Sequence, residues 1–375
     1  MTRTERIPMA YLNAAGAGLP DPAVHRRMIA HLSRALEIGD PAAEAEAAEE
    51  VARIRPRLAA LIGAETDELA FLDWGTLAWN AAILSLPVAG RRVLCAPGEW
   101  SSNVALLQRL GAQIEVMATD ATGKLDVPAI AARMGQDLAA ICLPLVCSLT
   151  GERYPVEAIG ALDRPESCFL VVDISQAVAQ MPVDMGALGA DIVAAPARKW
   201  LRGPKGTGFL AVRRAAMAHL APSRVADDGR LSWPDGIGLD CADATRFEKL
   251  GFNAALRLGL GAALDVHLAD ATGIQGRLAQ LAGHVRGRAA RLGVSLAGAE
   301  MARSAITTLR GPADMIGQLA ARAREAGHVV KLATPDCEPL RPAATVSGGF
   351  LRIAPHVYNT EAEIDALFDL FAAAA

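Results

Sequence analysis

Seven short apolar runs alternate with longer polar segments between residues 69 and 213, and this alternation constrains the fold more than any other feature. The runs are Leu69–Gly75, Arg92–Gly98, Ile114–Asp120, Leu138–Val146, Cys168–Ser175, Ile192–Ala197 and Gly208–Arg213. Short apolar runs bounded by turn residues are typical of buried strands, and most of the segments between them are long enough for a helical crossover. The sequence therefore predicts an α/β fold whose mainly parallel seven-stranded sheet is flanked by helices.

The chain on either side of this region is largely helical in pattern, and its C-terminal part predicts a second unit. Residues 21–62 carry apolar residues at helical spacing, with a break at Asp40-Pro41. Beyond a polar, irregular stretch (223–245), the patterns predict helices at 253–268, 275–292, 313–326 and 360–373, and strands at 294–297, 305–310, 329–333 and 350–355. We expect a large domain of residues 15–255 and a smaller α+β domain made from residues 1–14 and 256–375.

Composition argues against several classes of protein. The chain has 375 residues, of which 52% are hydrophobic and 21% charged, and this is typical of a globular protein. Its net charge is −4 and it has no basic block, so nucleic acid is not an expected partner. Because no apolar run reaches 18 residues and the N-terminus lacks an apolar signal segment, we expect a cytoplasmic protein without a membrane partner. The six cysteines form no CxxC pair and the seven histidines show no ligand spacing, which predicts neither disulfides nor a metal site.

An aspartate and a lysine end two successive apolar runs, and together they suggest a site for pyridoxal 5′-phosphate (PLP). Asp173 ends the run LVVD, and Lys199, one of only five lysines against 32 arginines, follows the run that starts at Ile192. In PLP enzymes a lysine forms a Schiff base with the cofactor aldehyde and a carboxylate keeps the ring nitrogen protonated. Both residues are also common at strand ends without such a role. The rival lysine, Lys205, lies in a Gly-Pro-Lys-Gly segment that is typical of an exposed turn.

Two other strand ends carry residues that could hold the rest of this cofactor. Gly75 and Thr76 end the first run and begin a helix pattern, where free N–H groups and the helix dipole suit a phosphate. An ordinary helix cap has the same pattern. Trp100 follows the second run and could stack on a planar ring, although a core or lid tryptophan is equally common there.

Three more polar residues fit the same hypothesis. Gln176 stands three residues after Asp173 and could hydrogen-bond the ring hydroxyl, while Arg198 could lower the pKa of Lys199 or bind the phosphate. Arg352 lies inside the apolar strand pattern FLRIAP and needs an anion partner. That partner could be the substrate α-carboxylate, held bidentately, or an acidic side chain in a salt bridge between domains.

Taken together, these segments resemble the class V aminotransferase group of fold-type I PLP enzymes, within the cysteine desulfurase-like superfamily. The most specific stretches are VVDISQAVAQMPVD, ARKWLRGPKGTGFLAV, RFEKLGFNAALRLGLGAALD and RIAPHVYNTEAEID. The stretch GEWSSNVALLQRLGA is similar to a branch that contains ergothioneine-type C–S lyases, lincosamide-pathway enzymes and isopenicillin-N-epimerase-like proteins.

The resemblance implies a homodimer and a role for each candidate residue. Lys199 is then the catalytic Schiff-base lysine, Asp173 the partner of the pyridinium nitrogen and Gln176 the partner of the ring oxygen. Gly75 and Thr76 hold the phosphate, Trp100 covers the ring, Arg352 binds the substrate carboxylate, and Asn13 lies near the substrate mouth. The segment Arg246–Asn253 reaches the site of the partner subunit.

The chain departs from cysteine desulfurases at several of these positions. A serine and a histidine precede the lysine in desulfurases, and a histidine stacks on the ring. The corresponding positions here hold Pro196 and Arg198, and either Trp100 or Ser101. In many relatives a threonine binds the phosphate of the partner subunit, and the corresponding position here falls near Gly251. Relatives also have an asparagine or threonine in the segment that reads Val146-Cys147-Ser148 here. Phosphate binding is therefore expected to depend more on arginine and backbone groups.

Four functions remain open from the sequence. The leading one is a β-lyase for a cysteine conjugate or sulfoxide, in which a Lys199 aldimine leads through a quinonoid to loss of thiolate or sulfenate and to pyruvate. The scaffold also allows an aminotransferase or epimerase of an amino acid. A cysteine desulfurase would use Cys337, which lies in a loop-like segment shortly before Arg352. The fourth is a non-enzymatic binding module, against which Lys199, Asp173 and Arg352 argue.

Overall fold

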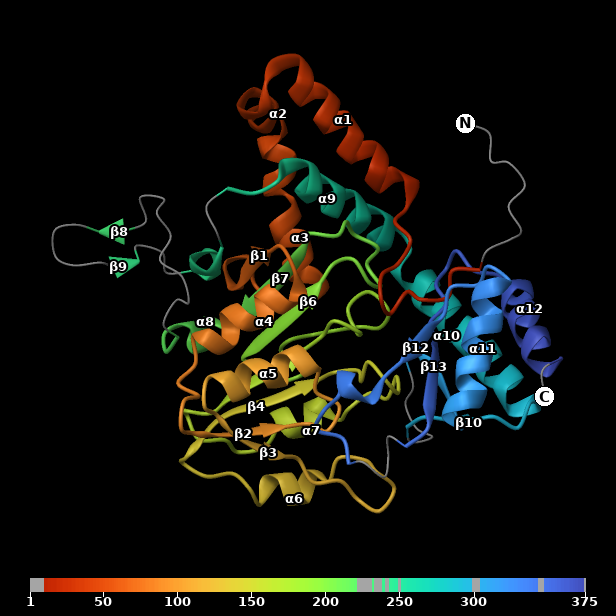
Figure 1. Ribbon diagram of the computed structural model, residues 1–375. Coiled ribbons are helices and arrows are strands. Elements are labelled where there is room, and N and C mark those ends of the chain that lie inside the picture. The colour runs from red at the N-terminus through yellow and green to blue at the C-terminus, as the bar shows by residue number, and fades with distance from the viewer. Residues whose placement is uncertain are drawn as a thin grey trace.

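The computed structural model describes residues 10–220, 231–232, 238–239, 243–248, 251–298, 304–342 and 347–373 (Figure 1). Each of the seven predicted runs overlaps a strand of one seven-stranded sheet, with the order β1-β7-β6-β5-β4-β2-β3. These strands are β1 (Leu69–Leu72), β2 (Arg92–Cys95), β3 (Gln113–Val116), β4 (Leu138–Pro144), β5 (Phe169–Asp173), β6 (Ile192–Pro196) and β7 (Gly208–Val212). The predicted α/β fold with a mainly parallel sheet is confirmed.

One strand of the sheet runs against the others. β7 pairs antiparallel with both β6 and β1, whereas β2, β3, β4, β5 and β6 pair in parallel. The connection from β6 to β7 spans residues 197–207 and contains no helix, so it cannot cross over to a parallel neighbour. It forms instead the turn that carries Lys199.

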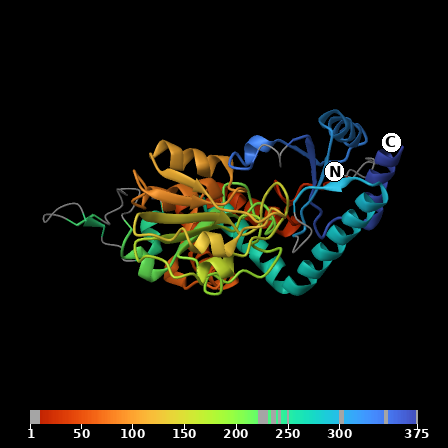
Figure 2. The ribbon, with the colours of Figure 1, turned by 90° about the horizontal axis from the view of Figure 1, so that it is seen from below.

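Helices cover both faces of the sheet (Figures 1 and 2). The alternation of side chains along β5 shows why, since Leu170 and Val172 join one buried cluster and Phe169 and Val171 the other. On the first face lie α3 (Ile54–Leu61), α6 (Val127–Ala131), α7 (Val156–Gly160) and α9 (Ala254–Ala269); on the second lie α4 (Gly75–Leu84), α5 (Ser101–Arg109) and α8 (Arg214–Met217).

The N-terminal helical region divides where the sequence predicts. α1 (Pro22–Ile38) ends at Gly39, whose φ of 86° suits glycine, and α2 (Asp40–Ala52) begins with Asp40-Pro41. These two helices protrude from the body of the protein (Figure 1). α9 packs against α1, α2 and α3, although the predicted domain division assigns it to the small domain. The division at residue 255 stays a prediction.

The C-terminal part forms a separate, smaller α+β unit. Its antiparallel sheet has the order β10-β11-β13-β12 and packs against helices through its own buried cluster. The elements are α10 (Ala271–Arg291), β10 (Ser295–Leu296), β11 (Thr307–Gly311), α11 (Ala313–Glu325), β12 (Lys331–Ala333), β13 (Gly349–Ile353) and α12 (Glu361–Ala372). Among the helices described, none combines the length and hydropathy needed to cross a bilayer.

Most of the stretch 223–245, and residues 249–250 of the predicted partner-reaching segment, lie outside the described residues. Within that stretch a short strand pair, β8 (Leu231–Ser232) and β9 (Gly238–Leu239), replaces the expected irregular chain. The described part of the chain also holds three 3-10 turns, namely η1 (Thr66–Glu68), η2 (Ala244–Phe247) and η3 (Pro335–Cys337).

Candidate active site

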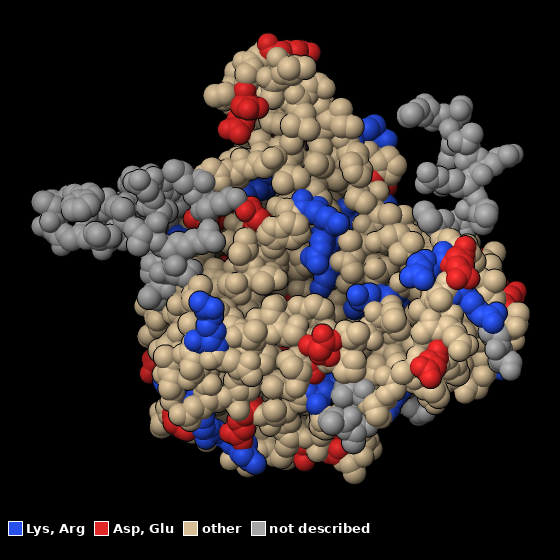
Figure 3. All heavy atoms as spheres, viewed as in Figure 1, with Lys and Arg blue, Asp and Glu red and all other residues tan. Residues whose placement is uncertain are grey.

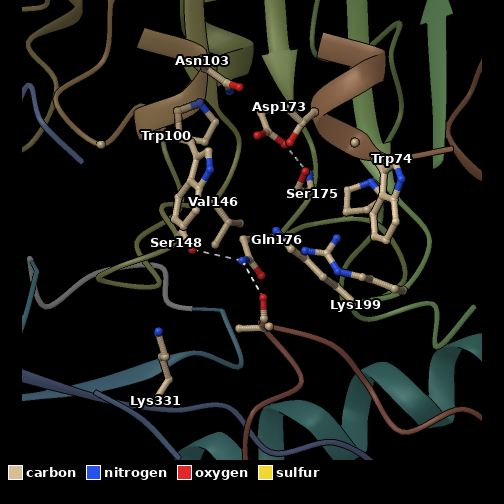
Figure 4. A pocket seen from close by; sticks show the side chains of 18 of the residues that line it. Trp74, Trp100, Asn103, Val146, Ser148, Asp173, Ser175, Gln176, Lys199 and Lys331 are labelled. Carbon is tan, nitrogen blue, oxygen red and sulfur yellow. Dashed lines mark hydrogen bonds between the residues drawn. The ribbon is translucent and has the colours of Figure 1, made fainter. Parts of the chain in front are cut away.

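A cavity of about 710 Å³ lies at the carboxyl ends of β4, β5 and β6, where the small-domain strands β12 and β13 close it. Ligands of open α/β sheets bind at this edge. All nine residues predicted for the site line it, namely Asn13, Gly75, Thr76, Trp100, Asp173, Gln176, Arg198, Lys199 and Arg352. Figure 3 shows basic side chains gathered in the central hollow of this face, and Figure 4 shows the cavity from close by.

The turn after β6 positions Lys199. Hydrogen bonds from Ala197 N to Thr207 O and from Gly203 N to Ala197 O close the turn. The N-terminal segment crosses it closely, because Gly18 N donates to Arg198 O and a Cβ on Gly18 would lie 2.5 Å from Lys199 O. Only glycine fits there. Lys205 is exposed on the far part of the turn, whereas Lys199 faces the cavity.

Lys199 is set up to be a neutral amine. The pKa of Lys199 is lowered from its usual 10.5 to about 7, mainly by desolvation; the charge of Asp173 opposes this shift, and the charges of Arg198 and Arg352 add to it. A neutral amine can act as a nucleophile or as a base, whereas an ammonium group can do neither. The predicted effect of Arg198 on this lysine has the sign that the sequence suggested.

Asp173 and Gln176 follow β5 on one side of the cavity. Asp173 Oδ1 accepts from Ser175 N at 2.7 Å, which fixes the carboxylate at the strand end. Gln176 is buried, and its Nε2 donates to Ala15 O at 3.0 Å and to Ser148 Oγ at 3.1 Å. Its Oε1 accepts from Trp200 Nε1 at 2.9 Å. The amide therefore already has protein partners, and a contact with a cofactor ring oxygen stays a prediction.

The N-terminus of α4 offers backbone donors to the cavity. Gly75, Thr76 and Leu77 line it, and no described side chain caps this ten-residue helix. A Cβ on Gly75 would lie 2.6 Å from Pro196 Cδ, so glycine lets the turn pack against β6. Uncapped N–H groups at a helix start bind anions such as phosphate.

Two tryptophans form opposite sides of the cavity. Trp100 and Trp74 both line it and are 38% and 43% exposed, which is unusual for residues of this size (Figure 4). Ser101, the other candidate for ring stacking, begins α5 and is not among the lining residues. Trp100 is therefore the candidate that the structure places at the site. Trp74 carried no sequence signal beyond its place before Gly75.

Arg352 lies on β13 and is buried against the large domain. Its Nη1 donates to Ser148 O at 3.0 Å and to Ser148 Oγ at 2.9 Å, and its Nη2 donates to Asn13 Oδ1 at 3.4 Å. Asn13 is brought here because Leu12 and Ala14 exchange backbone hydrogen bonds with Ala354. Within the described residues, the buried Nε of Arg352 has no partner. Among the described residues Arg352 makes no ion pair, although the nearby charge of Glu338 acts on it, so its role as the carboxylate receptor stays a prediction.

Glu99 is a buried carboxyl that sequence reasoning missed. Its Oε1 accepts from Asn103 Nδ2 at 2.8 Å and from Trp100 N at 3.0 Å, and in the described part of the chain its buried Oε2 has no partner. Desolvation, and then the charge of Asp173, raise the pKa of Glu99 to about 8. Glu99 is therefore mostly protonated at neutral pH. An acidic residue beside a predicted strand end was the only sequence signal.

The candidate nucleophile of the desulfurase hypothesis lies near Arg352, close enough for their charges to interact, but outside the cavity lining. Cys337 ends the 3-10 turn η3 and does not line the cavity. Desolvation, and then the charge of Glu338, raise the pKa of its thiol to about 12. Since the thiolate is the reactive form, Cys337 is poorly prepared for attack in this conformation.

Comparisons with known proteins agree with this architecture. Residues 10–367 match the family model described as aminotransferase class-V. The chain is 31% identical to a probable hercynylcysteine sulfoxide lyase from Mycobacterium tuberculosis (strain CDC 1551 / Oshkosh), over 99% of this chain and 92% of that protein. It is 30% identical to a cysteine desulfurase from Yersinia pestis (strain Pestoides F), over 69% of this chain and 66% of that protein.

Solved structures share the fold at lower identity. A cysteine desulfurase from Thermococcus onnurineus NA1 superimposes with a TM-score of 0.86 at 21% identity, covering 100% of this chain and 99% of that one. A cystine C–S lyase bound to cysteine persulfide superimposes with a TM-score of 0.84 at 18% identity, covering 97% of both chains.

The residues present fit PLP. The neutral amine of Lys199, the carboxylate of Asp173, the uncapped start of α4 and the exposed face of Trp100 supply four different contacts around one cavity. Each suits a different part of the cofactor, namely the aldehyde, the ring nitrogen, the phosphate and the ring face. With its site and its match over almost the whole length, this chain belongs to the class V aminotransferase family of PLP-dependent enzymes.

Proposed function

We propose that this enzyme cleaves the Cβ–S bond of an S-substituted cysteine or its sulfoxide. The Cα–H and Cβ–S bonds break, the sulfur group leaves with the bonding pair as a thiolate or sulfenate, and aminoacrylate is released. Water then converts aminoacrylate to pyruvate and ammonia. The similarity to a hercynylcysteine sulfoxide lyase along 99% of this chain supports this reaction over the others.

Lys199 and Arg352 carry the proposal. Arg352 would bind the α-carboxylate of the substrate through its guanidinium, which faces the cavity and has no acidic partner among the described residues. Lys199 would then remove the Cα proton with its Nζ, because its lowered pKa of about 7 leaves a large fraction of the amine neutral near pH 7. The single observation on which the proposal rests is this neutral amine in the same cavity as a buried carboxylate receptor.

The remaining residues would hold the cofactor and exclude water. Bound PLP supplies an electron sink that makes the Cα proton acidic. Asp173 would hold the ring nitrogen in its protonated form, the N–H groups of Gly75 and Thr76 would bind phosphate, and Trp100 would cover the ring. Arg198 adds positive charge beside Lys199 and is itself partly desolvated, which lowers its pKa.

The test is a visible absorbance scan of the PLP-loaded protein with L-cysteine and with several S-substituted cysteines and their sulfoxides, with pyruvate and sulfide assayed in the same samples. We expect the cofactor band to change and pyruvate to accumulate with the conjugates, and we expect no pyruvate from Lys199→Ala. Pyruvate that forms equally fast in Lys199→Ala would contradict the proposal.

The same samples separate the other reactions. An aminotransferase would convert the cofactor to its amine form and release no sulfur product, and an epimerase would change only the handedness of the amino acid. Either outcome without pyruvate would replace the lyase proposal. The mixed similarity to lyases and desulfurases makes this comparison necessary.

The desulfurase alternative has its own variant. A desulfurase would transfer sulfur to Cys337 and release alanine, so Cys337→Ala would abolish activity. We expect Cys337→Ala to keep full pyruvate formation, because its thiol is half-buried and has a pKa of about 12. Cys168→Ala, which changes a buried cysteine directly before β5, is the matched control.

A homodimer is part of the proposal. On α1, Ile29, Leu32 and Leu36 are 60%, 54% and 89% exposed, and their spacing puts them on one side of the helix. α1 protrudes from the body, so a partner subunit could cover this stripe (Figure 1). Phe252, which lies in the predicted partner-reaching segment Arg246–Asn253, is also exposed and adds to the apolar surface.

We also infer that the enzyme works in the cytoplasm. The five described cysteines are free, and four of them are buried. Free thiols are typical of a reducing compartment, because secreted proteins mostly pair their cysteines. Fractionation of the native host, with a cytoplasmic and a periplasmic marker enzyme followed in parallel, tests this inference.

A further inference from the structure

Lys331 is a second cation that faces the cavity from the small domain. It lies on β12, directly opposite Arg352 on β13, in an antiparallel pair. Residues that oppose each other in such a pair project from the same face of the sheet, and both side chains line the cavity. Figure 4 shows Lys331 on the small-domain side, apart from the residues that would contact the cofactor.

No carboxylate forms an ion pair with these two cations within the described residues, and Glu338, whose charge acts on Arg352, is itself paired with Arg341. Like charges directly opposite each other in a sheet are destabilising. Arg352 donates only to uncharged oxygens of Ser148 and Asn13, and within the described residues Lys331 makes no ion pair. Of the described residues that line the cavity, only Asp173 is acidic, and it lies across the cavity on β5. The two neighbouring cations therefore form a site for more negative charge than one carboxylate carries.

We propose that Lys331 binds a second anionic group of the substrate, and that the substrate is a cysteine conjugate whose sulfur substituent carries a carboxylate. This inference rests on the proposed function for the identity of the amino-acid part. Arg352 holds the α-carboxylate, and Lys331 holds the carboxylate at the far end of the substituent. Lys331 thereby determines specificity and takes no part in bond breaking.

The geometry limits the distance between the two carboxylates. Opposing Cα atoms in an antiparallel pair lie about 4.5–5.5 Å apart, and the flexible stem of lysine lets its ammonium follow ligands of different length. Lys331 is exposed, so the chemistry there is that of a partly solvated ion pair. Such a contact favours a charged over an uncharged substituent by about 3- to 10-fold.

The experiment measures binding to the PLP-loaded enzyme and does not depend on turnover. Isothermal titration compares glutarate, which has two carboxylates, with pentanoate, which has one carboxylate on a chain of equal length. We expect glutarate to bind about 3- to 10-fold more tightly, Lys331→Met to remove the difference, and Lys331→Arg to keep it. Lys124→Met changes a half-buried lysine that does not line the cavity and should leave both affinities unchanged.

The outcomes separate this inference from the proposed function. Equal binding of the two ligands by the unchanged enzyme would overturn the role of Lys331. So would a Lys331→Met variant that weakens pentanoate and glutarate alike, because Lys331 would then share the single carboxylate with Arg352. A lack of pyruvate from every cysteine conjugate would refute the lyase proposal alone, since the titration would still report the second carboxylate site.

Discussion

The pH at which Lys199 becomes reactive is the sharpest consequence of this structure. Only the neutral amine can attack the aldehyde of PLP. At pH 7.5 an amine with a pKa of about 7 is about three-quarters neutral, whereas one with the ordinary pKa of 10.5 is about 0.1% neutral. The neutral fraction is therefore roughly 700-fold larger than for a solvated lysine. Desolvation is the largest cause, so the effect should persist at high salt.

The assay is the rate at which cofactor-free protein takes up PLP, followed by visible absorbance between pH 5.5 and 10. Nα-acetyl-lysine, treated in the same way, reports changes that belong to the aldehyde itself. We expect a midpoint near pH 7 for the protein, and a higher midpoint in Arg198→Gln, because the charge of Arg198 lowers the pKa of Lys199. Arg291→Gln, at the end of α10, is the control. A midpoint near 10 in the unchanged protein would refute the argument from burial.

Three other predictions follow from single residues. Between the ordinary carboxyl pKa and about 8, the folded parent must keep Glu99 protonated, so its free energy of unfolding falls as the pH rises. Glu99→Gln removes this cost and should gain stability over the parent by roughly 1.4 kcal/mol for each pH unit in that range. Urea unfolding of both proteins at pH 5.5, 7 and 8.5 measures the difference, and a difference that does not change with pH would contradict the prediction. Arg352→Lys should raise the KM for the amino-acid substrate by about 10- to 100-fold and change kcat less, since lysine cannot bind a carboxylate bidentately. Leu36→Glu should convert a dimer to monomers in light scattering, and an unchanged mass would exclude the α1 stripe from the interface.

Much of the site was predictable because its residues follow strands within the same short segments. Asp173 ends β5, Lys199 follows β6, and Gly75 starts α4, so each position depends only on local sequence. In a parallel sheet the carboxyl ends of neighbouring strands meet at one edge, and this turns separate local patterns into one cavity. The antiparallel direction of β7 also had a local signal, because eleven residues without a helix pattern cannot form a crossover.

The remaining residues depend on contacts between distant segments. Lys331 is a site candidate only because β12 pairs with β13 in a register that opposes it to Arg352. The pKa of Glu99 is raised first by desolvation and then by the charge of Asp173, which lies far along the chain. Neither pairing nor burial of this kind leaves a pattern in a single sequence, so both residues required the structure.

The hydrogen bonds of Ser148 connect the predicted cofactor region of the cavity, at Gln176, with the predicted carboxylate region, at Arg352. Trp200 Nε1 can only donate, so the Gln176 atom it contacts is the oxygen, and Gln176 Nε2 must donate to Ser148 Oγ. Arg352 Nη1 also donates to Ser148 Oγ. Two donors occupy both lone pairs of the hydroxyl, so its own proton points elsewhere and is available to the cavity that Ser148 lines. Ser148, rather than the fully engaged Gln176, is therefore the side chain ready to donate a hydrogen bond to a ring oxygen or to the bound carboxylate.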